Sequence, residues 1–76
     1  MENIHENDEL KEFRHWVKVQ LVYRDSSQRR LAKELGIPHA RISEALHGKP
    51  SGDKYLIPII QFLGGDTKDF SSILKH

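Results

Sequence analysis

Apolar residues recur along the chain at helical spacing, in short blocks separated by polar residues and glycines. In the first block, which begins at Asp8, apolar residues lie three or four positions apart. They are Leu10, Phe13, Val17 and Leu21. This spacing predicts an amphipathic helix with one buried stripe, ending near residues 24–26. We expect the polar residues 1–7 to form a flexible N-terminus.

Two short helices are predicted in the middle of the chain, joined by Gly-Ile-Pro. Ser26 or Ser27 can cap the first of them, because a serine hydroxyl accepts a free backbone N–H. Gly36 follows this helix where a positive φ is usual, and Pro38 can open the next helix. Gly48 would end that second helix. The inner faces would hold Leu31, Ala32 and Leu35 in the first helix and Ile42, Ala45 and Leu46 in the second.

The segment KPSGDK, residues 49–54, has the composition of a loop. The apolar run YLIPIIQFL then predicts a helix from about Pro58 to Leu63. A proline fits the first turn of a helix, whereas it would cost a central strand a hydrogen bond. Gly64 and Gly65 would end this helix.

A last helix is expected near the C-terminus, capped by Asp66 or Thr67. Its apolar residues, which could close the bundle or form a dimer seam, are Phe70, Ile73 and Leu74. The sequence therefore predicts an all-α protein with a single domain of five helices over residues 8–76.

Positive charge is concentrated in the middle of the chain. Residues 1–12 hold one base and five acids, a net charge of −4, and residues 13–54 hold nine bases and four acids, a net charge of +5. Residues 55–76 hold two of each. This asymmetry favours a polyanion as the partner of the middle segment. The alternative is that these lysines and arginines only form a solvated surface.

Several classes of function lack support in the sequence. There is no cysteine, and the five histidines show no metal-binding spacing, so we expect no metal and no cofactor. No Gly-rich phosphate loop, nucleophile with a base, or pair of carboxylates indicates an enzyme. No secretory signal or membrane-spanning apolar run is visible, which leads us to expect a cytoplasmic protein without membrane contact.

One combination of residues resembles a known family. It consists of Gln28-x-x-Leu31-Ala32-x-x-Leu35-Gly36-Ile37, Ile42-Ser43, Gly48-Lys49, Tyr55-Leu56 and Phe62-Leu63-Gly64. This combination resembles the lambda-repressor-like helix-turn-helix domain of phage, plasmid and bacterial regulators. The resemblance covers about residues 10–74, with the motif itself at about 27–48. It implies a compact five-helix fold with the helix-turn-helix at the second and third helices.

The resemblance also implies which residues would bind double-stranded DNA. The positions that match contacts to backbone phosphate are Ser27, Gln28, Lys49 and Lys54. The positions that match base contacts in the major groove are His39, Ala40, Arg41 and Glu44. For His39, Arg41 and Glu44, simple exposure to solvent is the alternative.

The chemistry of the side chains agrees with this division. Ala40 can touch a thymine methyl, and His39 can donate to a purine acceptor. Arg41 can donate two hydrogen bonds to guanine, and Glu44 can accept one from cytosine N4. Contacts to phosphate, by contrast, fix register without reading sequence.

We therefore expect a sequence-specific transcriptional regulator, a repressor of phage or plasmid type that reads a short palindrome as a homodimer. It would act in the bacterial cytoplasm, at the nucleoid. The alternative is an interaction protein, an antirepressor or antitoxin, that retains the fold and binds a protein partner. Apolar residues of the first helix that could serve such contacts are Trp16, Val19, Val22 and Tyr23.

Overall fold

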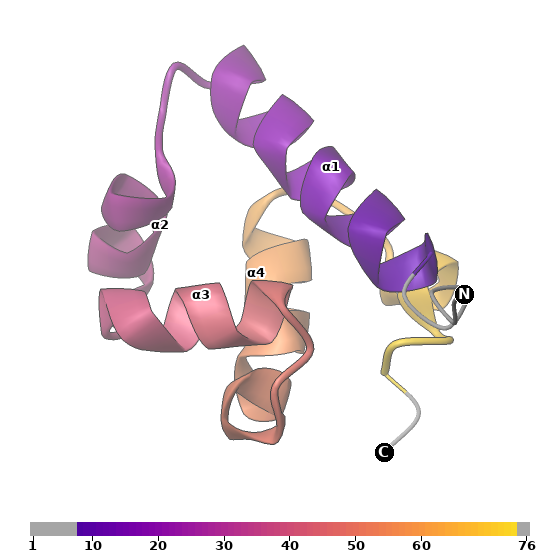
Figure 1. Ribbon diagram of the computed structural model, residues 1–76. Coiled ribbons are helices and arrows are strands. Elements are labelled where there is room, and N and C mark those ends of the chain that lie inside the picture. Colours follow the sequence, from indigo (N-terminus) through magenta and orange to yellow (C-terminus); the bar gives the residue numbers. More distant parts are fainter. Residues whose placement is uncertain (1–7, 75–76) are drawn as a thin grey trace.

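The computed structural model describes residues 8–74, and within this range it contains four α-helices, two 3-10 helices and no β-strand. In chain order these are α1 (Asp8–Tyr23), α2 (Gln28–Leu35), α3 (His39–Leu46), η2 (Pro50–Tyr55), α4 (Leu56–Phe62) and η3 (Thr67–Phe70). The all-α prediction is confirmed. In Figure 1, α1 lies along one side of the molecule, α2 and α3 lie below it, and α4 runs behind α3. The predicted flexible segment 1–7 lies outside the described residues, as do residues 75–76.

The core is formed by the apolar stripes of all four α-helices. Its buried residues are Phe13, Val17, Leu21, Leu31, Ala32, Ile42, Ala45, Leu46, Leu56, Ile59, Ile60 and Leu63. The stripe predicted for the first helix is confirmed, although Leu10 is only partly buried. The half-buried Trp16 packs against Phe13 and Phe70 at the edge of this core. Phe70, Ile73 and Leu74 also pack against it, so the C-terminal segment closes the bundle.

The turn between α2 and α3 follows the expected local chemistry. Gly36 has φ 69°, a left-handed conformation, and its N–H returns to the last turn of α2. This conformation suits glycine because an added Cβ is disfavoured there. Ile37 is partly buried against the core. Pro38 lies one position earlier than predicted, at the residue before α3, and its carbonyl accepts from the backbone N–H groups of Arg41 and Ile42.

The N-terminus of α2 is capped by Ser27, whose Oγ accepts the backbone N–H of Arg30 at 3.1 Å. Replacing Ser27 by alanine should lower the free energy of unfolding by about 1 kcal/mol, since an N–H of the first turn loses its partner. Thermal denaturation followed by circular dichroism measures the change. Ser26→Ala is the matched control, because no hydrogen bond of its hydroxyl is found within residues 8–74. Equal losses in both variants would contradict the capping role.

The last predicted helix is shorter than expected. In place of an α-helix through Leu74, the chain forms the single 3-10 helix η3, followed by turns. Asp66, one of the two predicted caps, accepts the N–H of Lys68 at 2.9 Å. The backbone bonds that follow join residues three apart, such as that from Ile73 N–H to the Phe70 carbonyl. The prediction of five α-helices is therefore wrong for the described residues, because this segment remains at the tighter 3-10 winding.

The segment predicted as a loop, residues 49–54, is also mostly helical. It forms η2, which runs directly into α4. The α4 helix begins at Leu56, two residues before the predicted start at Pro58. Pro58 is tolerated there because the first N–H groups of a helix have no intrahelical partner. Within residues 8–74, no helix has the length and apolar character needed to cross a membrane.

Candidate functional site

The first turn of α3 presents side chains to solvent. His39, Ala40 and Arg41 are all exposed, whereas Ile42 of the same helix is completely buried. The buried residues of α3 fix its rotation about its own axis, so its outward face is set by the core. This face is where the sequence predicted contacts with base edges.

Glu44, one turn further along α3, is held by two neighbours. Its Oε1 accepts from Arg41 Nη1 at 2.8 Å and from Ser51 Oγ of η2 at 2.7 Å. The Ser51 hydrogen bond lowers the pKa of Glu44 below its ordinary value of 4.5, and the nearby positive charges of Arg41 and Lys49 act in the same direction. A partial loss of solvation opposes this shift. Glu44 is therefore a carboxylate that joins α3 to η2 and orients Arg41.

The two predicted phosphate contacts beyond α3 lie at the two ends of η2. Lys49 immediately precedes this 3-10 helix, and Lys54 is its fifth residue. Both side chains are exposed. The Lys54 ammonium lies 5.4 Å from the ring centroid of Tyr55, a distance typical of a cation–π contact.

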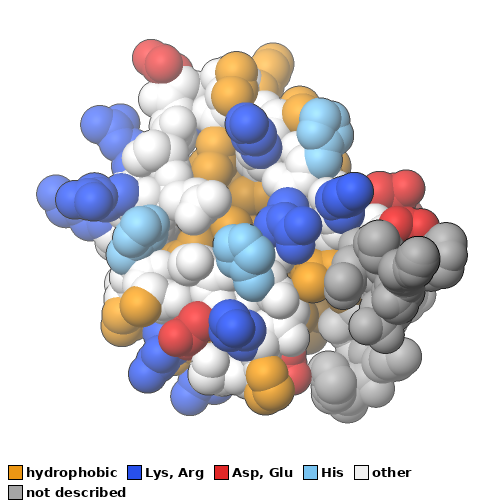
Figure 2. All heavy atoms as spheres, in the orientation of Figure 1, with side chains coloured by type: hydrophobic (Ala, Val, Ile, Leu, Met, Phe, Trp, Pro, Cys, Tyr) orange, Lys and Arg blue, Asp and Glu red, His pale blue; other side chains and the backbone are white. Residues whose placement is uncertain are grey.

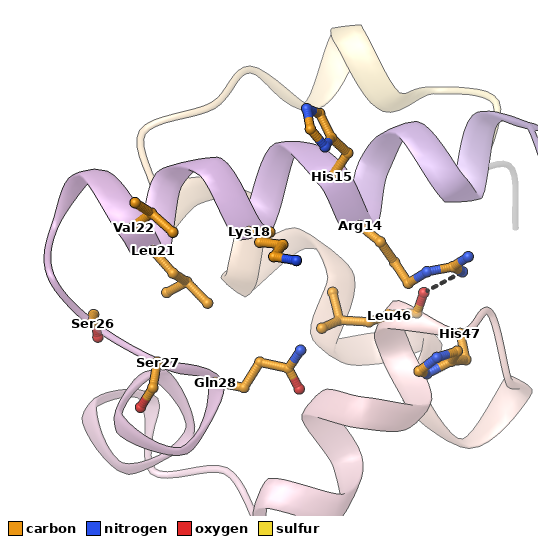
Figure 3. Close-up of a pocket in the computed structure, with 10 residues that line it drawn as sticks. All are labelled: Arg14, His15, Lys18, Leu21, Val22, Ser26, Ser27, Gln28, Leu46 and His47. Atoms are coloured by element: carbon orange, nitrogen blue, oxygen red, sulfur yellow. Dashed lines mark hydrogen bonds between the residues drawn. The ribbon is translucent and has the colours of Figure 1, made fainter.

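A pocket of about 460 Å³ lies between α1, the beginning of α2 and the end of α3. Its apolar lining includes Leu21, Val22 and Leu46, and none of its lining residues is acidic. Figure 3 shows the side chains of Lys18 and Gln28 directed into the space between the helices. Its polar lining includes Arg14, His15, Lys18, Ser27, Gln28 and His47.

The wall of this pocket at the end of α3 is fixed by two hydrogen bonds. Arg14 donates from Nη1 to the Leu46 carbonyl at 3.2 Å, and the two groups are joined by the dashed line in Figure 3. The ring of His47 lies with Nδ1 2.9 Å from the Ser43 carbonyl. Because a carbonyl only accepts, this nitrogen carries the proton, and Nε2 is left for other contacts. A cation beside the last carbonyls of a helix also stabilises that helix end.

Basic side chains gather on one face of the molecule. Figure 2 shows lysine, arginine and histidine side chains over α1 and α3, with acidic side chains mainly toward the edge of the view. The pocket opens among these groups, and its lining comes from the same helices. The positive middle segment of the sequence therefore contributes several of the basic groups on this face.

The structure brings the predicted residues together only in part. Ser27 and Gln28 line the pocket, whereas the residues predicted to read bases lie on α3. Lys49 precedes η2 and Lys54 lies on it. Four basic groups of the pocket were not among the predicted site residues; they are Arg14, His15, Lys18 and His47. Arg14 and Lys18 are one helical turn apart beside the buried stripe, and this spacing is the signal that could have drawn attention to them.

No cluster of three or more histidine or acidic side chains that could hold a metal ion is found in residues 8–74. Comparisons with protein-family models, with curated proteins and with solved structures find no match to this chain.

Proposed function

We propose that this protein is a sequence-specific DNA-binding regulator, built as a lambda-repressor-like helix-turn-helix domain from α2 and α3. The observation that carries the proposal is the exposed first turn of α3, which lies on a face rich in lysine, arginine and histidine. A helix with a buried inner side and an exposed polar start has the shape required to enter a major groove. The surrounding basic groups would bind the phosphates on either side.

In this proposal Arg41 is the main reader of sequence. Its guanidinium can donate two hydrogen bonds to the O6 and N7 atoms of guanine. The ion pair with Glu44 holds the arginine side chain in place before binding, and Ser51 holds the carboxylate from the other side. Glu44 would then orient Arg41 instead of accepting from cytosine.

The proposed regulator is a repressor that acts in the bacterial cytoplasm as a homodimer. One α3 helix of eight residues covers only a few base pairs. Two copies related by a two-fold axis would read half-sites about one helical turn apart, which raises both affinity and specificity.

The test of the function is selection of bound duplexes from a random pool at near-physiological salt. Enrichment of a two-fold-symmetric sequence is the expected result, and it would also supply the operator. Binding that occurs only at low salt and enriches nothing would reduce the function to non-specific contact with phosphate. No binding at any salt concentration would exclude the proposal.

The division of roles gives a further prediction. Arg41→Ala should reduce discrimination between the selected operator and a changed one by about 1–3 kcal/mol, because a base contact is lost. Lys49→Ala should weaken binding to all duplexes alike and lower the salt slope by about one unit. Fluorescence anisotropy with both duplexes, at several salt concentrations, measures the two quantities. Identical effects of the two substitutions would show that Arg41 does not read bases.

A second candidate function is supported by apolar side chains at the end of α1. Val22 is 71% exposed and Tyr23 is 85% exposed, while Val19 is 46% exposed. Exposed apolar groups of this kind are typical of protein-binding surfaces when they form a patch. An antirepressor or antitoxin would use them to bind a protein partner. In that case the selection experiment would recover no duplex, while Val22→Asp would abolish binding of the partner.

A further inference from the structure

We propose that the pocket between α1, α2 and α3 is a phosphate-binding site that takes a DNA backbone phosphate through α1 residues. The proposal rests on the proposed function and extends it, because it adds Arg14 and Lys18 to a contact surface otherwise assigned to α2, α3 and η2.

The positive charge of the pocket is uncompensated. Arg14 and Lys18 of α1 line it together with His47, and no carboxylate does. Within residues 8–74, the Lys18 ammonium takes part in no hydrogen bond or ion pair. Arg14 uses Nη1 for the Leu46 carbonyl, which leaves most of the N–H groups of its guanidinium available. An anion would therefore gain contacts without breaking those that hold the fold.

The start of α2 adds neutral donors on the opposite side. Ser27 accepts from the N–H of Arg30, and its carbonyl accepts that of Leu31. The N–H groups of Gln28 and Arg29, at the first two positions of the helix, have no intrahelical partner. The amide side chain of Gln28 points toward the pocket (Figure 3). Arg14, Lys18 and the start of α2 therefore face the same pocket, a combination suited to binding phosphate.

The apolar lining favours a phosphate that carries a sugar. Leu21 and Leu46 are almost fully buried, while Val22 is exposed at the rim. Carbon atoms beneath the site exclude water and strengthen the attraction between the charges above them. The exposed Val22 can contact a deoxyribose ring beside the phosphate. A backbone phosphodiester would use both properties of the pocket, whereas free inorganic phosphate would use only the charge.

The position of the pocket agrees with a contact of this kind. It opens on the same basic face as α3, where Figure 2 shows lysine, arginine and histidine side chains over both helices. A duplex that receives α3 in its major groove would pass one of its strands over the start of α2 and the adjoining side of α1. The pocket would then fix the register of the protein on that strand.

The test compares Lys18→Met with Lys68→Met. Both substitutions remove one exposed lysine charge and keep an unbranched side chain, but Lys68 lies on η3 and does not line the pocket. Kd for one duplex is measured at several salt concentrations for wild type and both variants. Lys18→Met should weaken binding about tenfold and lower the salt slope by about one unit, whereas Lys68→Met should change neither. Equal melting temperatures of the three proteins establish that folding is intact.

A second measurement separates the possible sources of the phosphate. Sodium phosphate is titrated into the 15N-labelled protein without DNA, and the NMR chemical shift of the Gln28 backbone amide is followed. Sodium chloride at equal ionic strength is the control. Duplex binding whose salt slope is unchanged by Lys18→Met would overturn the proposal. Failure of wild type to bind any duplex, with a saturable shift that Lys18→Met abolishes, would overturn the proposed function and assign the pocket to a free phosphate ligand. If wild type binds no duplex and phosphate causes no shift of the Gln28 amide, both the proposed function and the phosphate site are overturned.

Discussion

Gly52→Ala is expected to lower the free energy of unfolding by about 3 kcal/mol, which is at the upper end for overpacked sites. A Cβ at this position would lie 2.2 Å from the backbone nitrogen of Ala45 and 2.7 Å from the carbonyl carbon of Glu44. Both are backbone atoms of α3, so no side-chain rotation can relieve the contact. The variant must therefore move η2 away from α3. For a domain of this size the melting temperature should fall by roughly 15 °C.

Gly36→Ala is the control that separates steric contact from backbone conformation. Gly36 has φ 69°, but nothing lies within 4 Å of the position of an added Cβ. Its replacement should cost only about 1 kcal/mol, which is the usual penalty of the left-handed conformation. Gly52 is not among the glycines with positive φ, so its cost would arise from contact alone. Urea denaturation of both variants measures the difference, and an equal or smaller loss for Gly52→Ala would contradict the close approach of η2 to α3.

Phe13→Ala is expected to cost about 3–5 kcal/mol, because a fully buried aromatic side chain leaves a cavity. Phe13 is 0% exposed, and its ring centroid lies 5.3 Å from that of Phe70 in an edge-on arrangement and 6.3 Å from that of Trp16. The substitution would therefore loosen the contact between α1 and the C-terminal segment as well as the core. A domain of this length is stabilised by roughly 4–11 kcal/mol in total, so the variant should be close to unfolding at room temperature.

Val19→Ala provides the matched control for this prediction. Val19 lies on the same helix and is 46% exposed, so its truncation should change stability by no more than about 0.5 kcal/mol. Denaturant unfolding followed by far-ultraviolet circular dichroism compares the two variants. A loss for Phe13→Ala no larger than that for Val19→Ala would show that the aromatic cluster is not part of the core.

The features of the fold that depend on neighbouring residues could be predicted from the sequence. The spacing of Phe13, Val17 and Leu21 predicted the buried side of α1, and the glycine after α2 predicted the turn at Gly36. A cap at Ser26 or Ser27 followed from the preference of serine for a helix start, and Ser27 provides it. Each of these depends on contacts or conformations within one helical turn.

Features that depend on distant parts of the chain could not be predicted in the same way. The composition of KPSGDK indicates a loop, and η2 forms there with the backbone at Gly52 close against α3, a contact between segments that sequence spacing does not reveal. The pocket is a second example. The buried stripe predicts which side of α1 faces the core, but not which flank of that side borders the end of α3. Arg14 and Lys18 became part of a candidate site only once that flank was known.

The exposure of the first turn of α3 has a consequence for how this protein could diversify. His39 and Ala40 contribute nothing to the core, so substitutions there should leave folding nearly unchanged. The position of α3 is fixed instead by the buried Ile42 and by the packing of Gly52 against this helix. Under the proposed function, the exposed residues of this turn would contact DNA without being part of the core that fixes the helix. Under that proposal, a library randomised at positions 39 and 40 could explore new target sequences without a loss of folded protein.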